Sequence, residues 1–338
     1  MKIAIISKLW EETSPFSVGG TGVAVGILAD ELVKRGHDVT LFATGDSVTK
    51  AKLISGRDKP WGNEYSEPIE YLHMAEAFSP KYNFDIIDAH VEQKACFFAD
   101  ATKTPTLINI TYGEFGDEQK VFDRYPHLNY VGISHEMKKV LPKINWVDVI
   151  YHGIDVNLFE YNDMPDDYLL FLGRVSPQKG PHIAINVVKK LGKKLIIAGK
   201  MSDADKAYLD EKVMPFIDGK QIMYVGIADF KKKVGLLKNA AALLHPIQYV
   251  EAFGLTIIEA FACGTPVISY DNGAPREIIA DRKTGFIVNS EEEMAEAVKN
   301  LHTISRKACR DHVESKFTVE KMVDEYESLY KKIISSSE

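Results

Sequence analysis

The chain has 338 residues, of which 45% are hydrophobic and 26% charged, a composition that excludes a disordered or low-complexity protein. Acidic residues outnumber basic ones, 48 against 41, and the net charge of −7 disfavours a nucleic-acid partner. Because this length exceeds that of one ordinary hydrophobic core, we expect two domains. Three widely spaced cysteines, no signal-peptide pattern and no bilayer-length apolar run favour a cytoplasmic protein, and peripheral contact with the inner face of a membrane stays open.

Short apolar runs alternate with longer amphipathic segments along the whole chain. Residues 2–7 predict a buried strand, residues 23–35 a helix that Gly36 ends, and residues 38–43 the next strand. Further strands are predicted at 85–89, 106–110, 130–133, 147–150, 169–172, 195–198, 222–225, 241–245 and 266–269, with a polar linker at 153–167 and a last amphipathic helix at 317–334. Continuous apolar strands that alternate with helices predict two doubly wound α/β domains with parallel sheets.

A glycine-rich turn follows the first strand and a loop. Gly19, Gly20 and Gly22 open the predicted helix, where glycines let the backbone approach a ligand and free N–H groups attract an anion. The spacing departs from the G-x-G-x-x-G fingerprint of dinucleotide-binding proteins, and the loop is too long for that fingerprint's tight turn. The turn is therefore either an anion or sugar site or a flexible surface loop.

Two cations follow the first strand of the second half. Arg174 comes directly after Gly173, and Lys179 follows in the same loop. Open α/β sheets bind ligands at the carboxyl ends of their strands. Two cations at that edge suit a diphosphate, whose charge they neutralise as it leaves, and the alternative is a pair of solvated surface cations.

Two glutamates stand in the densest cluster of candidate residues, at 245–268. Glu251 lies in a loop, and Glu259 lies in a predicted helix among apolar neighbours, where an acid must be paired or face a polar cleft. Their spacing would return along a helix to nearly the same face, so we expect both carboxylates to line one cleft. The alternative is an acid at a helix entry, stabilised by the macrodipole, and a second acid at a solvated helix position.

The start of that helix offers backbone groups to a phosphate. The amides of Gly254, Leu255 and Thr256 lie at the predicted helix N-terminus and could bind phosphate oxygens. A carboxylate deeper in the same helix suits the hydroxyls of a ribose, as in other nucleotide-binding folds. This pattern favours a nucleotide ligand for the second half.

Together these motifs resemble the retaining glycosyltransferases of family 4. The residues that carry the resemblance are Gly173-Arg174 with Lys179-Gly180, Glu251-x-Phe253-Gly254-Leu255 with Glu259-Ala260, and Cys263-Gly264-Thr265-Pro266-Val267, with weaker matches at Gly19-Gly20 and His152-Gly153-Ile154-Asp155. The resemblance covers the whole chain and implies the GT-B fold, in which two facing Rossmann-like doubly wound domains enclose an inter-domain cleft. It implies an acceptor-side domain of residues 1–157 plus 314–338, whose last helix crosses back, and a donor-binding domain of residues 158–313.

The resemblance also implies roles for individual residues. The two cations would hold the diphosphate of a nucleotide-sugar donor, Glu251 would bind the transferred sugar, and Glu259 would bind the ribose. His90 resembles a histidine that touches the transferred sugar, although a lone histidine after a strand is otherwise a core residue. The implied catalytic set is Glu251, Arg174, Lys179 and His90, and the implied donor-binding set is Gly19, Gly20, Gly173, Arg174, Lys179, Phe253, Gly254, Leu255, Thr256, Glu259 and Ile227.

Two departures from the family pattern leave the sugar open. Tyr112 stands where the family often has a histidine, and Pro246-Ile247 replaces the usual Pro-Ser before the first glutamate. Both positions lie near the expected donor or acceptor pocket. The nucleotide, the sugar and the acceptor are therefore not specified by the motifs.

Neither a divalent metal nor a cofactor is expected. A D-x-D triplet occurs at Asp203-Ala204-Asp205, but Ser202 precedes it at the start of a helix, where Ser and Asp serve as caps. The lysine run at 231–233 is interpreted as the solvated start of a helix, and the alternative is a membrane-facing patch.

The implied activity is transfer of a hexose from a UDP- or GDP-sugar to an acceptor hydroxyl, with retention through same-face attack. The acceptor would be a carbohydrate, a lipid-linked sugar or a small molecule. Alternatives are a nucleotide-sugar epimerase of the same fold and a non-catalytic sugar-nucleotide-binding protein. A NAD-dependent dehydrogenase is disfavoured by the missing fingerprint.

Overall fold

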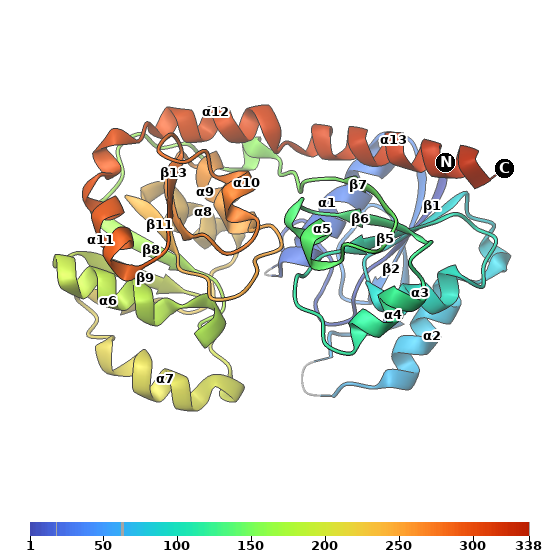
Figure 1. Ribbon diagram of the computed structural model, residues 1–338, viewed down its shortest axis with the longest axis horizontal. Helices are drawn as coiled ribbons and strands as arrows, with labels where there is room; N and C mark the ends of the chain where they lie inside the picture. Colours follow the sequence, from blue (N-terminus) through green and yellow to red (C-terminus); the bar gives the residue numbers. More distant parts are fainter. Residues whose placement is uncertain (18, 62–63, 338) are drawn as a thin grey trace. The chain divides into compact units, whose positions relative to one another are not determined.

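The computed structural model describes residues 1–17, 19–61 and 64–337 and divides the chain into two compact units (Figure 1). Unit 1 comprises Met1–Ile154 and Val319–Glu338, and unit 2 comprises Asp155–Thr318. The boundaries expected from the sequence, 157/158 and 313/314, assign residues 155–157 and 314–318 to the other unit. The second difference arises because the preceding helix continues to Lys316 and the Phe317 ring packs on Phe253, at 6.0 Å between centroids, within unit 2.

Unit 1 is built on one parallel seven-stranded sheet in the order β3-β2-β1-β4-β5-β6-β7. Its strands are β1 (Lys2–Ile6), β2 (Asp38–Thr44), β3 (Lys52–Arg57), β4 (Ile86–Ala89), β5 (Thr106–Ile110), β6 (Asn129–Gly132) and β7 (Trp146–Val149). Its helices are α1 (Gly20–Lys34), α2 (Glu67–Ala77), α3 (Gln93–Ala99), α4 (Glu118–Arg124), α5 (Glu136–Val140) and α13 (Val319–Ser337). The central strands β1, β4 and β5 are almost wholly buried and mostly apolar, which agrees with a sheet covered on both faces.

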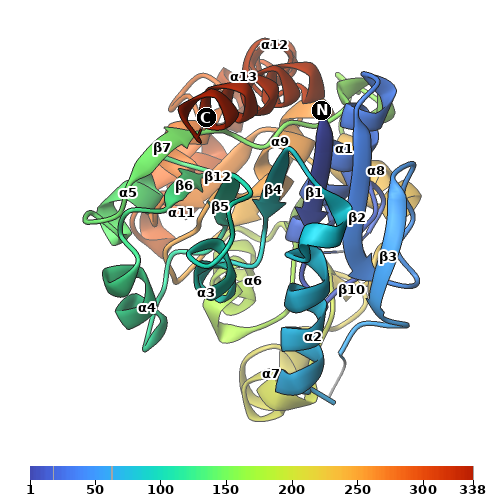
Figure 2. The same ribbon diagram turned by 90° about the vertical axis from the view of Figure 1, so that its right-hand side faces the viewer.

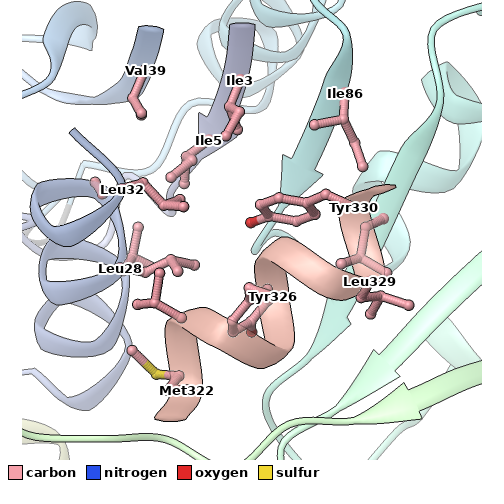
Figure 3. Packing of buried hydrophobic residues seen from close by; sticks show 14 of the residues in the cluster. Ile3, Ile5, Leu28, Leu32, Val39, Ile86, Met322, Tyr326, Leu329 and Tyr330 are labelled. Carbon is pink, nitrogen blue, oxygen red and sulfur yellow. The ribbon is translucent and has the colours of Figure 1, made fainter. Parts of the chain in front are cut away.

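Helix α13 brings the end of the chain back to unit 1. It packs beside α1, and its apolar residues join Ile3, Leu28 and Leu32 in one buried cluster (Figure 3). Helices α2 and α3 contact the sheet from the other side (Figure 2). The amphipathic spacing of Met322, Tyr326 and Leu329 explains why this segment is helical and which of its faces is buried.

A buried carboxylate connects α13 to the centre of the sheet. Asp88 of β4 is fully buried and accepts hydrogen bonds from the Tyr330 hydroxyl, at 2.6 Å, and from the Asn109 amide. The Tyr326 hydroxyl in turn donates to the Asn109 side-chain oxygen, at 2.7 Å. Because a buried charge needs such partners, the two tyrosines bind α13 to the sheet with a defined register.

Unit 2 contains a parallel six-stranded sheet in the order β10-β9-β8-β11-β12-β13. Its strands are β8 (Tyr168–Leu172), β9 (Lys194–Ala198), β10 (Ile222–Tyr224), β11 (Ala242–His245), β12 (Val267–Tyr270) and β13 (Gly285–Val288). Its helices are α6 (Pro181–Leu191), α7 (Lys206–Lys212), α8 (Phe230–Asn239), α9 (Leu255–Ala262), α10 (Pro275–Ile278), α11 (Glu291–Lys299) and α12 (Arg306–Lys316). The predicted α/β class with two parallel doubly wound sheets is confirmed.

Two strands, β3 and β13, were not predicted, and α2 is among the helices that were not predicted individually. Strand β3 lies at the edge of its sheet, with a half-exposed pattern and Gly56 in its sequence, so it lacks the continuous apolar run of a central strand. Strand β13 has only four residues. Among the described helices, none has the length and apolarity needed to cross a membrane.

Candidate active site

The candidate site lies where the order of strands in the unit 2 sheet reverses. Strands β8 and β11 are neighbours, but the chain leaves β8 toward β9 and β10 and leaves β11 toward β12 and β13. The loops that follow these two strands therefore diverge at their carboxyl ends. In open α/β sheets this topological switch point is where ligands bind.

A close approach at a glycine and a backbone hydrogen bond hold the two loops together. Gly180 has a φ of +71°, and a Cβ at this position would lie 2.2 Å from the Pro246 carbonyl oxygen. Next to it, the Gln248 N–H donates to the Gln178 carbonyl, at 2.7 Å. Only glycine permits both this backbone conformation and this approach, so the Lys179-Gly180 dipeptide sets the spacing of the two loops.

A buried ion pair lies between the loops. The Lys179 ammonium is 3.0 Å from Oε2 of Glu251, and the Glu251 residue is only 9% exposed. The Tyr249 hydroxyl lies 3.4 Å from the same oxygen, and the ammonium lies 4.9 Å from the centre of the Tyr249 ring. The predicted sugar-binding glutamate and diphosphate-binding lysine are thus direct neighbours.

The backbone of Glu251 is fixed by the loop after β12. Its N–H donates to the Asn272 carbonyl, at 3.1 Å, and its own carbonyl accepts from the Ala274 N–H, at 2.9 Å. Gly273, with a φ of +87°, makes this approach possible, because a Cβ there would lie 2.5 Å from the Glu251 carbonyl oxygen. The carboxylate is therefore presented by a preorganised backbone, as a binding site requires.

The pKa values of this cluster are shifted in directions that keep the pair charged. Burial disfavours the ionised form of Glu251, but Lys179 and His245 outweigh it and hold the pKa of Glu251 below its usual value. Burial likewise lowers the pKa of Lys179, but Glu251 and Tyr249 reverse this and raise the pKa. Burial lowers the pKa of His245 to about 4, so its imidazole is neutral at physiological pH.

The other predicted donor-binding groups of this edge lie around the pair. Arg174 is exposed, and its guanidinium makes no ion pair or hydrogen bond within the described part of the chain. Gly254 has a φ of +95° and caps α9, so the N–H groups of Leu255 and Thr256 lie in the first turn, where the helix provides no acceptors. The Phe253 side chain is buried, which leaves only its backbone available to a ligand.

The two glutamates do not share a helical face, contrary to the sequence expectation. Helix α9 begins at Leu255, so the chain between Glu251 and Glu259 is only partly helical. Glu259, 3% exposed, pairs instead with Lys233 of α8, at 2.5 Å between Nζ and Oε1. The left-handed Gly254 breaks the helix that the spacing argument assumed.

The interpretation of the lysine run at 231–233 as a solvated helix start is wrong for its last member. The Lys233 side chain is only 14% exposed because of its pairing with Glu259. Lys231 and Lys232 are exposed. Ile227, expected near a nucleotide base, is 53% exposed in the loop after β10.

Unit 1 carries the remaining predicted residues. His90 follows β4, beside β1, which is the switch point of the first sheet. It is 2% exposed, and its Nε2 is 3.0 Å from the Asp88 carboxylate. It is thus a buried histidine with a defined partner, and its expected contact with a transferred sugar stays a prediction.

The glycine turn of unit 1 already holds a carboxylate. Gly19 caps α1, and Gly20 begins the helix. Oε1 of Glu11 accepts a hydrogen bond from the Gly22 N–H, at 2.7 Å, and a Cβ on Gly19 would collide with the Glu11 carboxyl group. Burial raises the pKa of Glu11. The turn therefore binds an anion, and in this structure that anion is the protein's own.

Two further features of unit 2 are structural. The Ser202 hydroxyl accepts a hydrogen bond from the Ala204 N–H, at 3.3 Å, so the D-x-D triplet is a capped turn. The described residues contain no cluster of three or more His, Cys, Asp or Glu side chains suited to a metal ion.

A cavity of about 440 Å³ lies beside Arg306. The Arg306 guanidinium donates to the carbonyls of Ala240 and Lys238, at 2.9 and 2.8 Å, and so connects α12 to the end of α8.

Sequence reasoning missed His245, Tyr249 and Lys233. A histidine that ends an apolar strand at the carboxyl edge of the sheet was a usable signal for His245. Tyr249 and Lys233 offered none, because their roles come from contacts between elements distant in sequence.

The geometry of unit 2 agrees with a known family. The family model described as glycosyl transferases group 1 matches residues 159–315, which is nearly the whole of unit 2. The D-inositol 3-phosphate glycosyltransferase of Mycobacteroides abscessus is 28% identical, over 89% of this chain and 81% of its own length.

Solved structures resemble the chain over its whole length. Sucrose-phosphate synthase from Thermosynechococcus elongatus has a TM-score of 0.81 at 19% identity, over 99% of this chain and 100% of its own. HepE of Anabaena, solved in complex with UDP and glucose, has a TM-score of 0.79 at 17% identity, over 98% and 100%. The expected GT-B fold is thereby confirmed.

The family model and the relatives indicate an enzyme of the glycosyltransferase class. More narrowly, the similarity to glycosyl transferases group 1 lies in unit 2.

Buried neutral histidines make the stability of the fold depend on pH. Burial lowers the pKa of His245 to about 4 and that of His152 to about 3, whereas an unfolded histidine titrates near 6.5. As the pH falls through the unfolded value, the unfolded chain takes up protons that the folded chain does not. The free energy of unfolding should therefore fall by on the order of 1 kcal/mol per pH unit for each histidine between about pH 6 and pH 5.

Urea denaturation across this range measures the slope, which His245→Gln should reduce. His127→Gln, whose side chain is 61% exposed, is the matched control and should keep the parental slope. Equal slopes for the parent and His245→Gln would contradict the lowered pKa of the buried His245 imidazole.

The Lys233–Glu259 pair should behave as a buried ion pair. Lys233→Gln leaves the Glu259 carboxylate buried without its counter-ion, which typically costs about 3–5 kcal/mol of unfolding free energy. Adding Glu259→Gln removes the unpaired charge and should restore most of that loss. Chemical denaturation of the single and double variants measures the coupling energy of the pair, and Lys231→Gln, at an exposed position, is the control. A Lys233→Gln variant as stable as the parent would refute the stabilising role of the pair.

Proposed function

We propose that this protein transfers a hexose from a nucleoside-diphosphate sugar, UDP- or GDP-linked, to an acceptor hydroxyl with retention of the anomeric configuration. The observation that carries the proposal is the buried Lys179–Glu251 pair at the switch point of unit 2, beside the free Arg174. Cations and unpaired helix amides suit a diphosphate, and an oriented carboxylate suits sugar hydroxyls.

The donor would bind along this edge through its charged and hydroxyl groups. Arg174, Lys179 and the first-turn amides of α9 would take the diphosphate. The Lys179 ammonium has three N–H donors, so it can bind a phosphate oxygen while it still donates to Glu251. Glu259 would accept from the ribose hydroxyls with the oxygen that Lys233 does not bind.

The site would lower the barrier mainly by stabilising the leaving group. Negative charge develops on the diphosphate as the bond to the sugar breaks, and cations that are already in position stabilise that charge most in the transition state. Glu251 would orient the sugar without bonding to it. In same-face attack, a donor phosphate oxygen would accept the proton of the acceptor hydroxyl. No divalent metal is assigned a role in this scheme.

UDP-glucose is the first donor to test, because the similar HepE structure holds UDP and glucose. Calorimetric titration with UDP-glucose, UDP-N-acetylglucosamine, GDP-mannose and ADP-glucose, with and without EDTA, would identify the donor. Metal-independent binding of one donor is the expected result. Failure of all four to bind would refute the proposal.

Substitutions at the ion pair separate binding from turnover. Lys179→Gln should weaken UDP binding, and Lys179→Gln and Glu251→Gln should each lower turnover by roughly 100-fold, the scale of one preorganised transition-state contact. Glu251→Gln should leave UDP affinity nearly unchanged, because its contact is with the sugar. The measurements are UDP release during transfer and calorimetric affinity for UDP.

Folding must be checked in the same experiment, because Lys179→Gln leaves the Glu251 carboxylate buried and unpaired. The Lys179→Gln/Glu251→Gln variant removes that charge and should recover stability without recovering activity. Lys212→Gln, 54% exposed on α7, is the surface control. Transfer at a near-parental rate in either single variant would refute the proposed role of the substituted residue in catalysis.

The glycine turn of unit 1 provides a separate test of donor binding. If this turn takes an anionic group of the donor, the Glu11 carboxylate competes with it. Glu11→Gln should then tighten UDP binding about two- to fivefold, as expected for 0.3–1 kcal/mol at a helix N-terminus. Calorimetry compares it with the neighbouring Glu12→Gln, and an unchanged affinity would exclude the turn from the donor site.

A further inference from the structure

His90 follows β4 with its backbone and one ring nitrogen fixed. Its N–H donates to the Ile6 carbonyl of β1, at 2.9 Å, and its Nε2 lies 3.0 Å from Oδ2 of Asp88. The other ring nitrogen, Nδ1, makes no hydrogen bond within the described residues, and it is not one of their fully enclosed polar atoms that lack a partner. The ring thus has one nitrogen bound by the protein and one that a ligand can reach.

The Asp88 carboxylate is held by donors on both of its oxygens. The Tyr330 hydroxyl of α13 donates to Oδ2, at 2.6 Å, which is the oxygen that His90 also contacts. The Asn109 amide donates to Oδ1. Asp88 is fully buried, so these protein groups are its hydrogen-bond partners in place of water. Because a carboxylate only accepts, the His90 nitrogen that faces it carries a proton.

A second tyrosine of α13 sets the orientation of the Asn109 amide. The Tyr326 hydroxyl donates to Oδ1 of Asn109, at 2.7 Å, so the amide nitrogen must face Asp88. Burial and the charge of Asp88 raise the pKa of both tyrosines well above the usual value, so both keep the protons that they donate. Tyr330 lies between α13 and the strands of the sheet (Figure 3). The last helix therefore determines how Asp88 is presented to His90.

We propose that Tyr330 and Asp88 are positioning residues, through which α13 holds the proton of His90 on Nε2 and leaves Nδ1 as an acceptor for a hydroxyl of a bound substrate. The proposal rests on the proposed transferase function and deepens it, because it makes His90 a hydrogen-bond acceptor for the substrate. A phosphate oxygen also only accepts, so it would find no donor at Nδ1.

The position of the proton can be measured in the full chain without any ligand. Long-range proton–nitrogen NMR of protein labelled with ¹⁵N in its histidine rings distinguishes a protonated from an unprotonated ring nitrogen. His90→Gln identifies the signals of His90 by their loss. At mildly alkaline pH the parent should carry the proton on Nε2. A proton on Nδ1, or a mixture of the two tautomers, would overturn the proposal.

Asp88→Asn should reverse the tautomer. The Asn109 amide nitrogen would still need an oxygen opposite it, so the new side-chain amide would turn its NH₂ group toward His90. Nε2 would then have to accept, and the proton would move to Nδ1. In Ser-His-Asp hydrolases the same change costs ~10⁴-fold in kcat through the wrong tautomer, and we expect UDP release from UDP-glucose to fall roughly 100-fold or more. An unchanged tautomer in Asp88→Asn would refute the role of Asp88.

Tyr330→Phe removes only the hydroxyl by which α13 reaches Asp88. With one donor fewer, the carboxylate is free to turn away from His90, so the Nδ1-protonated tautomer should gain population. UDP release should fall roughly tenfold, the scale of one hydrogen bond to a charged group, while the calorimetric affinity for UDP stays parental. Since phenylalanine keeps the ring in place, this variant keeps the test valid even if Asp88→Asn unfolds.

Tyr130→Phe is the matched control for a purely structural loss. Tyr130 is also fully buried in unit 1, and its hydroxyl donates to the Tyr125 carbonyl, at 2.7 Å, away from Asp88. This variant should keep the parental His90 spectrum and the parental rate of UDP release. Equal losses in Tyr130→Phe and Tyr330→Phe, or a parental spectrum in Tyr330→Phe, would overturn the positioning role of α13.

The two proposals fail in different ways. Calorimetry with nucleoside-diphosphate sugars tests the transferase function, whereas the His90 spectrum of the ligand-free chain tests the hydrogen bonds within unit 1. Donor binding combined with a parental spectrum and rate in Asp88→Asn would overturn the positioning role and leave the transferase function standing. Failure of every nucleotide sugar to bind would overturn the transferase function, and the role of His90 toward its substrate with it.

Discussion

The approach of two loops at the reversal of the unit 2 sheet is the constraint on which the candidate site depends. Gly180 lets one loop lie against the Pro246 carbonyl, and the Lys179–Glu251 pair then spans the small gap between them. Burial makes this pair costly to break, and the attraction between the two groups outweighs the desolvation that would otherwise neutralise them. The same interaction that holds the loops together therefore also keeps a cation and a carboxylate ready for a polar ligand.

What could be predicted from the sequence was local, and what could not was tertiary. Continuous apolar strands, the Gly173-Arg174 step and the glutamate pattern all lie within short stretches of chain, and they sufficed for the confirmed fold and enzyme class. The partner of Glu259 could not be found this way, because Lys233 lies on another helix within an apparently solvated run. A single left-handed residue, Gly254, also invalidated an argument based on helical spacing.

The two units present different chemistry at the carboxyl edges of their sheets. The edge of unit 2 carries the Arg174 guanidinium, the Lys179–Glu251 pair and the first-turn amides of α9, whereas carboxylates and aromatic rings gather beside the first turns of α2, α3 and α4 in unit 1. The two doubly wound units therefore differ more in electrostatics than in architecture.

The return of α13 to unit 1 has a consequence for biosynthesis. A ribosome delivers the whole of unit 2, residues 155–318, before the helix whose tyrosines satisfy Asp88. During that interval of roughly ten to thirty seconds at ordinary rates of elongation, the nascent first unit lacks the helix that covers part of its sheet and satisfies Asp88. The early part of the chain must therefore wait in an incomplete state, in which chaperone binding competes with aggregation, until the final helix closes it.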